Sequence, residues 1–390
     1  MRPTGKRSVQ RLLFALATSL AGHAVADAER ADIGAAVQQA AGQVMQQYGI
    51  PGLAIAVTAN GEQHFYNFGV ASRETRQAVT RDTLFEVGSV SKTLTVTLAA
   101  YAEANGKLSL SDSPGQYLPQ LKGSQLDPVT LINLATHTAG GFPLQLPDEV
   151  QNHQQLMDYY SSWQPRFAPG TYRTYANPSI GLLGVIAARS LGMPYAKAME
   201  SELLPKLGMR STFIDVPASA MPRYAQGYNK DDAPVRVNPA MLAAEAYGVK
   251  TSSKDLLHFV EANLGQVAMD DASLQQAIDA TRTGYYRLGA MTQALIWEQY
   301  DYPVALQTLL EGNASRMALE SHAVTAITPP LAPQQAVWVN KTGSTNGFGA
   351  YVAFVPEKKF GIVLLANKNY PNEERVKLAY RILGELEAHQ

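Results

Sequence analysis

Apolar runs near the two ends of the chain have the pattern of β-strands. Residues 53–58 (Leu-Ala-Ile-Ala-Val-Thr) and 64–70 (His-Phe-Tyr-Asn-Phe-Gly-Val) flank Asn60-Gly61, a dipeptide that suits the positive φ angles of a tight hairpin turn. Three further runs, separated by Gly, Pro and charged turns, follow near the C-terminus: Ala336–Lys341, Phe348–Val355 and Phe360–Ala366. Both ends of the chain are therefore predicted to contribute antiparallel strands.

Helical spacing of apolar residues dominates the rest of the chain. It is present in Ile33–Gln47 and in Glu373–Leu386, where Pro371-Asn372 is a helix start signal. The long middle, from about Leu94 to Leu310, has helical periods broken by loops that contain Gly and Pro. This arrangement predicts an α/β (α+β) fold, in which an antiparallel sheet formed by both chain ends is flanked by helices and carries a mostly helical inserted lobe.

No repeat of fixed period and no low-complexity linker divides the sequence. We therefore expect residues 27–388 to form a single unit, with a sheet lobe from about 27–93 and 311–388 and a helical lobe from about 94–310. A cleft between two such lobes is the natural place for a site.

The first 26 residues have the order of a secretory signal peptide. Basic residues from Arg2 to Arg11 precede an apolar stretch, Leu12–Ala21, and the small residues Ala24-Val25-Ala26. A membrane anchor is the alternative, but a bilayer span needs about 20 apolar residues and this stretch has roughly half that number. We expect residues 1–26 to direct export to the periplasm and the mature chain to have no stable association with a membrane.

Composition narrows the chemistry. The chain has 390 residues, 32 basic and 33 acidic side chains and a net charge of −1, so no global field favours nucleic acid or anionic membranes. It contains no cysteine, which excludes a thiolate nucleophile and Cys-ligated metal. Its seven histidines are scattered and form no H-E-x-x-H pair. We expect no metal, no cofactor, a small-molecule ligand and a monomer.

Gly88-Ser89-Val90-Ser91-Lys92 is the first candidate for catalysis. On a helix, Ser89 and Lys92 share one face with Cβ atoms roughly 5 to 6 Å apart, so the amine can move protons to and from the hydroxyl. An exposed helix start has the same spacing, so the motif alone does not decide between the two interpretations.

Tyr175-Ala176-Asn177 follows a turn-like Ala-Pro-Gly and precedes an apolar run. A buried phenol can act as base or acid when positive neighbours bring its pKa from about 10 toward neutrality. Packing and capping are the ordinary roles of such a tripeptide.

Lys341-Thr342-Gly343 stands at the end of a predicted strand and is followed by Ser344. An edge strand there could pair with an extended substrate, with Lys341 attracting a carboxylate and Gly343 allowing close approach. A simple strand-end turn is the alternative.

The three motifs together, S-x-x-K, Y-x-N and K-T-G in this order, resemble the serine β-lactamase and penicillin-binding protein superfamily. The tyrosine in the second motif is similar to that of class C β-lactamases, the cephalosporinases. The resemblance extends over nearly the whole mature chain and includes six segments: 83–93, 139–145, 175–182, 246–250, 341–349 and 367–372.

This resemblance implies hydrolysis of β-lactam antibiotics, cephalosporins preferred and penicillins also, through an acyl-enzyme on Ser89. It implies that Lys92 and Tyr175 share proton transfer and that the backbone N–H groups of Ser89 and Ser344 hold the oxyanion. Asn177 and Gln145 would hold the substrate side-chain amide, and Tyr247 would form an apolar wall. The residues implied to bind or attract the ring carboxylate are Lys341, Thr342, Asn369, Asn372 and Arg375.

Four positions depart from the class C pattern: His137, Ala240, Ala243 and Ile296. His137 stands where a tyrosine is usual, Ala240 and Ala243 replace a glycine and an aspartate, and Ile296 replaces a glycine. Since replacing glycine restricts the backbone and adds bulk, we expect an altered substrate profile with the chemistry retained.

Two other interpretations remain open at this stage. One is a D,D-peptidase or esterase of the same superfamily, and the other is a penicillin-binding sensor that is acylated without turnover.

Overall fold

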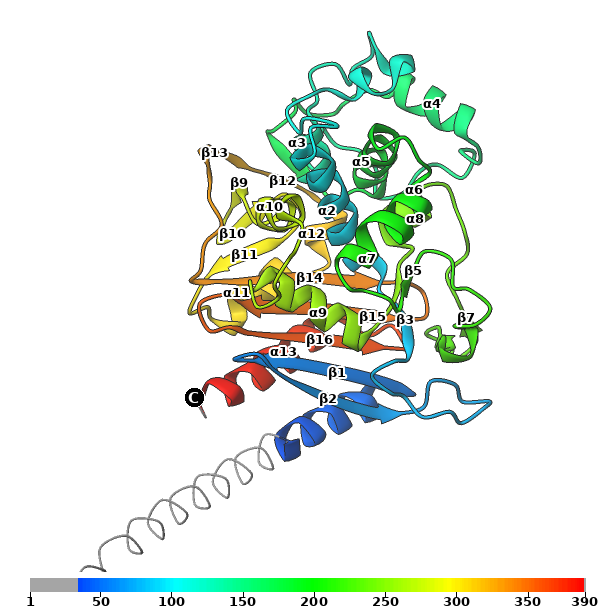
Figure 1. Cartoon of the computed structure of the whole chain (residues 1–390), viewed down its shortest axis with the longest axis vertical. Helices are drawn as coiled ribbons and strands as arrows, with labels where there is room; N and C mark the ends of the chain where they lie inside the picture. The colour runs from blue at the N-terminus through cyan, green and yellow to red at the C-terminus, as the bar shows by residue number, and fades with distance from the viewer. Residues whose placement is uncertain (1–33, 389–390) are drawn as a thin grey trace, which may run out of the picture.

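The computed structural model describes residues 34–388, and the predicted signal peptide lies outside the described residues. Within this range the main sheet has nine strands, and every pair of neighbours is antiparallel. The strand order is β13-β9-β10-β11-β14-β15-β16-β1-β2. Both chain ends meet in it, because β1 pairs with β16 over the register from Leu53↔Ala366 to Ala59↔Phe360 (Figure 1).

The strands predicted at the chain ends are confirmed. The first hairpin consists of β1 (Gly52–Ala59) and β2 (Glu62–Gly69), and its turn residues Asn60 and Gly61 have φ angles of 52° and 84°. The C-terminal strands are β14 (Val337–Ser344), β15 (Gly349–Val355) and β16 (Phe360–Ala366). The remaining strands of the sheet are β9 (Gly284–Leu288), β10 (Met291–Ala294), β11 (Glu298–Asp301) and β13 (Thr325–Leu331).

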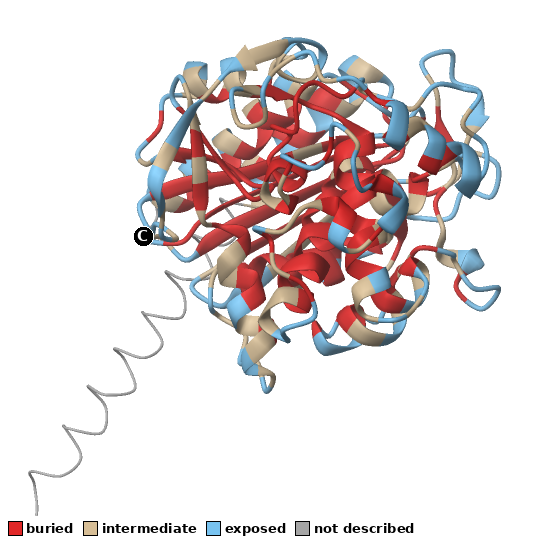
Figure 2. Cartoon of the chain, turned by 90° about the horizontal axis from the view of Figure 1, so that it is seen from above, coloured by how far each residue is buried: buried red, intermediate tan, exposed pale blue. Residues whose placement is uncertain are grey.

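The central strands read as unbroken apolar runs because both faces of the sheet are covered. Along β1, Ala54 and Ala56 face one hydrophobic core, whereas Leu53, Ile55 and Val57 face the other. The first core lies between the sheet and the helical lobe. The second lies between the sheet and the two terminal helices, residues 34–48 and α13 (Asn372–Ala388). The buried strands cross the middle of the molecule in Figure 2.

The helical lobe is built around α2 (Ser91–Ala104), a helix buried along nearly its whole length. Its neighbours include α5 and α10, and α9 packs on β16 and β1. The other helices within the described range are α3 (Leu131–Ala135), α4 (His153–Ser162), α5 (Asn177–Ser190), α6 (Tyr195–Lys197), α7 (Leu204–Lys206), α8 (Ala243–Tyr247), α9 (Ser253–Asn263), α10 (Ala272–Thr281), α11 (Leu306–Gly312) and α12 (Arg316–Leu319).

Short strands outside the main sheet form three small sheets, two of which pair segments of the two lobes. One small sheet has the order β3-β8-β5, another pairs β12 with β4, and a third pairs β6 with β7. Their bounds are β3 (Leu84–Glu86), β4 (Tyr172–Thr174), β5 (Thr212–Phe213), β6 (Gly227–Tyr228), β7 (Pro234–Val235), β8 (Lys250–Ser252) and β12 (Ser321–Ala323). Strand β3 leads directly into the segment that carries Ser89.

The predicted boundary of the helical lobe was wrong at its C-terminal end. Residues 284–301, placed there by the sequence interpretation, form β9, β10 and β11 of the main sheet. These strands are short, and they bury polar side chains such as Gln293 and Gln299, which are satisfied by hydrogen bonds. A strand of that kind lacks the long apolar run by which the others were found.

Candidate active site

Ser89 lies on the 3₁₀ turn η1 (Gly88–Val90), directly before α2. One turn further along, the fully buried Lys92 donates from Nζ to Ser89 Oγ at 2.9 Å and to the Ala246 carbonyl at 2.8 Å. Burial, reinforced by the charge of Lys341, lowers the pKa of Lys92 to about 8. The amine is therefore placed to take up or return the hydroxyl proton near neutral pH.

Tyr175 is positioned by β4 on one side and the start of α5 on the other. Its ring centroid lies 5.1 Å from Lys92 Nζ and 5.0 Å from Lys341 Nζ. Burial alone would raise the pKa of this phenol, but the ammonium groups of Lys341 and Lys92 lower it to about 8. Its Oη is buried and has no hydrogen-bond partner among residues 34–388.

Strand β14 supplies the opposite wall of the site. Strand β11 pairs with it only as far as Asn340, so residues 341–344 are unpaired on that edge. The edge lies directly against η1, since a Cβ on Gly343 would collide with the Val87 carbonyl and approach Ser89 N to 3.0 Å. The lack of a side chain at Gly343 therefore brings the backbone of Ser344 next to that of Ser89.

A cavity of about 520 Å³ opens above these groups. Its lining includes Ser89, Tyr175 and Lys341, together with Ser344 from the end of β14. The predicted binding residues on its wall are Gln145, Asn177, Tyr247, Thr342, Gly343, Asn369 and Asn372. The structure thus brings together in one cavity residues from six separate segments of the sequence.

Arg375 is the predicted binding residue that the structure does not place on the cavity. Its side chain is fully buried under β14, where it donates to Gly343 O at 2.7 Å and to Ser344 Oγ at 3.0 Å. It also donates to Asn369 Oδ1 at 2.6 Å. The prediction that Arg375 contacts a substrate carboxylate is therefore corrected, and its contacts instead hold Ser344 and Asn369 in place.

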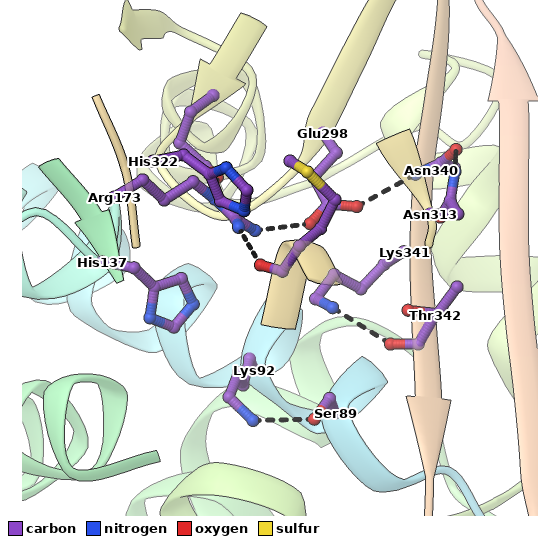
Figure 3. A network of polar contacts seen from close by, with 12 residues as sticks. Ser89, Lys92, His137, Arg173, Glu298, Asn313, His322, Asn340, Lys341 and Thr342 are labelled. Carbon is purple, nitrogen blue, oxygen red and sulfur yellow. Dashed lines mark hydrogen bonds and ion pairs between the residues drawn. The ribbon is translucent and has the colours of Figure 1, made fainter. Parts of the chain in front are cut away.

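A buried polar network behind the site was missed by the sequence analysis (Figure 3). Arg173 and Glu298, exposed by only 1% and 7%, form an ion pair at 2.8 Å. Arg173 also donates to Gln293 Oε1 at 2.7 Å, and Glu298 accepts from Asn340 at 3.3 Å. Arg173 and Glu298 both line the cavity. Nothing in the sequence joins positions so far apart, although Arg173 stands only two residues before Tyr175.

Glu86 is a second missed residue, buried two positions before Gly88. Its carboxylate accepts from Tyr224 Oη at 2.6 Å, from Val237 N at 2.8 Å and from Thr345 Oγ1 at 2.6 Å. Val237 and Thr345 both line the cavity, so Glu86 ties the wall around Val237 to the segment that follows Ser344.

The four departures from the class C pattern lie at different depths. His137 is buried against Tyr175, with 4.3 Å between ring centroids. Ala240 is exposed, whereas Ala243 and Ile296 are buried. None of these four residues is among those that line the cavity. The side chains at these four positions therefore form no part of the cavity wall, and the altered substrate profile stays a prediction.

Ile296→Gly is expected to lower stability and to leave the substrate profile unchanged. Ile296 is 1% exposed and packs in the core between the sheet and the helical lobe. Emptying that space should reduce the free energy of unfolding by about 3 to 5 kcal/mol. Urea unfolding measures the loss, and cephalosporin and penicillin rates measured beside it should keep their ratio. A changed ratio in a variant of unchanged stability would contradict this expectation.

Within residues 34–388, no group of three or more His, Cys, Asp or Glu side chains is placed to hold a metal ion. In the same part of the chain, no single helix has the length and hydropathy of a membrane span. One pair of helical segments, Asn177–Ser190 and Tyr195–Lys206, reaches that length and hydropathy only when the two are taken together, and they are bent by 75° relative to each other.

Comparison with known proteins gives consistent matches over the whole described chain. The family model "Beta-lactamase" matches residues 37–387. A β-lactamase from Pseudomonas fluorescens is 55% identical over 91% of this chain and 99% of its own length, and one from Escherichia coli K12 is 45% identical over 88% and 91%.

Solved structures agree with these sequence matches. A protein described as β-lactamase/D-alanine carboxypeptidase from Pseudomonas syringae superimposes with a TM-score of 0.89 at 60% identity, covering 90% of this chain and 99% of that one. A class C β-lactamase in complex with cefoxitin gives a TM-score of 0.88 at 52% identity, covering 91% and 99%.

Proposed function

The chain belongs to the β-lactamase family and hydrolyses β-lactams as a class C enzyme of antibiotic resistance, and from this premise we propose the role of each residue and the preferred substrates. The observation that supports the proposal most strongly is the contact of Lys92 Nζ with Ser89 Oγ at 2.9 Å, beside a phenol that lies between two lysine ammonium groups.

In acylation, Ser89 Oγ attacks the lactam carbonyl, and its proton passes to the Lys92–Tyr175 pair. The oxyanion that develops is held by the backbone N–H groups of Ser89 and Ser344, which are fixed before the reaction begins. The C–N bond of the ring then breaks, and the pair returns the proton to the departing nitrogen. The acyl group remains on Ser89 as an ester.

In deacylation, a water molecule attacks this ester while Tyr175 takes one of its protons. Collapse of the tetrahedral intermediate breaks the bond to Ser89 Oγ, and the serine regains its proton through Lys92. The product is the ring-opened acid. This step separates a β-lactamase from a penicillin-binding sensor, in which the ester would persist.

Substrate orientation follows from free hydrogen-bonding atoms on the cavity wall. Asn177 Oδ1 is buried without a partner among the described residues, so it can accept from a side-chain amide N–H, with Gln145 beside it. Asn369 Oδ1 is occupied by Arg375, which leaves its Nδ2 to donate. This donor can bind the ring carboxylate together with Thr342, Asn372 and the charge of Lys341. Tyr247 forms the apolar wall of the cavity.

The pH dependence of kcat/KM is expected to be bell-shaped with its maximum at about pH 8. Lys92 and Tyr175 each have a pKa of about 8. In acid both groups hold their protons and neither can act as base, whereas in alkali both have lost them and neither can protonate the leaving nitrogen. Rates measured from about pH 5 to 10 test this. In Lys92→Arg, whose guanidinium does not titrate, a bell unchanged in position would contradict the assignment.

We propose that cephalosporins are the preferred substrates and that penicillins are turned over more slowly. The purified mature chain is expected to hydrolyse nitrocefin and cephalothin continuously, with higher kcat/KM for cephalothin than for benzylpenicillin. Mass spectrometry of the quenched mixture should show a transient adduct. A stoichiometric adduct that persists without turnover would indicate a sensor, and faster benzylpenicillin turnover would overturn the preference.

A second activity, release of D-alanine from an acyl-D-Ala-D-Ala peptide, is favoured by the name of the relative from Pseudomonas syringae. The same serine and oxyanion donors would serve it. Free D-alanine measured from a model peptide tests it, and absence of release by an enzyme active on nitrocefin would exclude it.

We also propose that residues 27–388 form one monomeric catalytic unit and that residues 1–26 direct its export to the periplasm. The N-terminal mass of the protein recovered from the periplasmic fraction, together with its mass by light scattering, tests these proposals. A mature protein that still begins at Met1 would overturn the cleavage, and a dimer would overturn the monomer.

A further inference from the structure

His137 makes three contacts with the segment that carries Tyr175. Its carbonyl accepts from Thr174 N at 2.9 Å, and its ring Nδ1 accepts from Ala176 N at 3.2 Å. Its ring lies against the Tyr175 ring, with centroids 4.3 Å apart and planes tilted by 40°. One residue therefore holds the peptide on both sides of Tyr175 and one face of its phenol ring.

The backbone of His137 is adapted to this role. It follows α3 with a φ of 61°, in the left-handed region, where His and Asn are enriched over most other residues. This conformation lets the carbonyl and the side chain of the same residue reach Thr174 and Ala176, which flank Tyr175.

The imidazole must be neutral to make these contacts. Burial, followed by the charges of Arg173, Lys92 and Lys341, holds the pKa of His137 well below its ordinary value. A neutral ring that accepts at Nδ1 carries its proton on Nε2, and Nε2 is buried without a partner among the described residues. The hydrogen bond at Nδ1 is therefore the one that fixes the ring, and Figure 3 shows the ring on the Lys92 side of the site.

We propose that His137 is a positioning residue for the hydrolysis of β-lactams: its Nδ1 acceptor and its ring face hold the Tyr175 phenol where it can exchange a proton with Ser89. The inference rests on the proton-transfer role proposed above for Tyr175. It concerns a residue that lies outside the cavity lining and acts only through its neighbour.

Three variants separate the contacts. His137→Phe keeps a ring and removes the acceptor. His137→Asn removes the ring but keeps an acceptor, because Asn Oδ1 is attached to Cγ as His Nδ1 is. Asparagine also tolerates the left-handed backbone conformation. His137→Gly removes both without backbone strain. Cephalosporin kcat, KM and the melting temperature are measured for each, with circular dichroism to establish folding.

We expect kcat to fall about 10- to 100-fold in the Phe and Gly variants, since small displacements of a reacting group are costly. KM should stay within about twofold because the variants leave the cavity wall intact. His137→Asn should recover most of the lost kcat. A purely structural residue would lower the melting temperature and leave kcat of the folded fraction unchanged, which would overturn the proposal.

The decisive measurement is a double-mutant cycle with Tyr175→Phe. If His137 acts through the phenol, adding His137→Phe or His137→Gly to Tyr175→Phe should reduce kcat no further, and a multiplicative loss would overturn the proposal. Should the Phe variant fail to fold, the Gly variant completes the cycle. If Tyr175→Phe alone retains full kcat, the proposed role of Tyr175 fails, and the His137 proposal fails with it, while β-lactam turnover by the wild type still stands.

Discussion

Ser89→Ala is expected to reduce cephalosporin turnover by at least about 10⁴-fold, as loss of a nucleophile does in other serine hydrolases. Alanine has no oxygen to form the ester, so no acyl-enzyme can accumulate. The fold should persist, because Ser89 lies on the cavity wall and Lys92 Nζ, which loses the Ser89 hydroxyl, still donates to the Ala246 carbonyl. Initial rates with nitrocefin and the mass of the quenched protein measure both effects.

The matched control is Ser161→Ala, an exposed serine on α4 whose hydroxyl donates only to the Asp158 carbonyl. It should retain wild-type rates and the transient adduct. An adduct that formed on the Ser89→Ala protein would show that another residue is the nucleophile.

Tyr175→Phe is expected to reduce kcat by about 10²- to 10⁴-fold, the range found for loss of a general acid or base. Its effect on stability should be small. The phenyl ring keeps its packing on His137, and Ser89 Oγ and Lys92 Nζ keep their contact with each other when the buried Tyr175 hydroxyl is removed. Stopped-flow rates and thermal unfolding measure the two quantities separately.

Tyr159→Phe provides an equivalent change away from the reaction. Tyr159 lies on α4, its hydroxyl is also buried without a partner in the described chain, and it does not line the cavity. This variant should turn over at the wild-type rate. Equal losses in both variants would indicate a general effect of removing a buried hydroxyl and would contradict a proton-transfer role for Tyr175.

Each motif of the site could be predicted because it is local in sequence, whereas the resemblance to class C β-lactamases implied that the motifs form one site. The S-x-x-K spacing alone places Lys92 beside Ser89, as the 2.9 Å contact shows. Strand β1 and the three C-terminal strands could be predicted because their side chains alternate between two apolar cores, and β2 follows from the Asn60-Gly61 turn. In these places the local pattern and the tertiary environment require the same residues.

The missed features depend on contacts between distant segments. Glu298 reads as a polar residue in a short strand until Arg173, 125 positions away, pairs with it in the interior. Arg375 was predicted to bind or attract the ring carboxylate, yet its Nη1 and Nη2 atoms donate to carbonyls and side chains under β14. A buried charge is tolerated only where its partners exist, and a sequence pattern does not reveal those partners.

The pairing of β1 with β16 determines when during synthesis the protein can fold. Leu53 meets Ala366 across more than three hundred intervening residues, so the sheet that carries Lys341 cannot close around Ser89 until almost the whole polypeptide has been synthesised. Topologies with such high contact order fold slowly, because the chain loses the entropy of loop closure before the stabilising long-range contacts can form. A chain terminated before β14 would carry Ser89 and Lys92 but would lack the wall of the cavity. It would therefore have the nucleophile without catalytic activity.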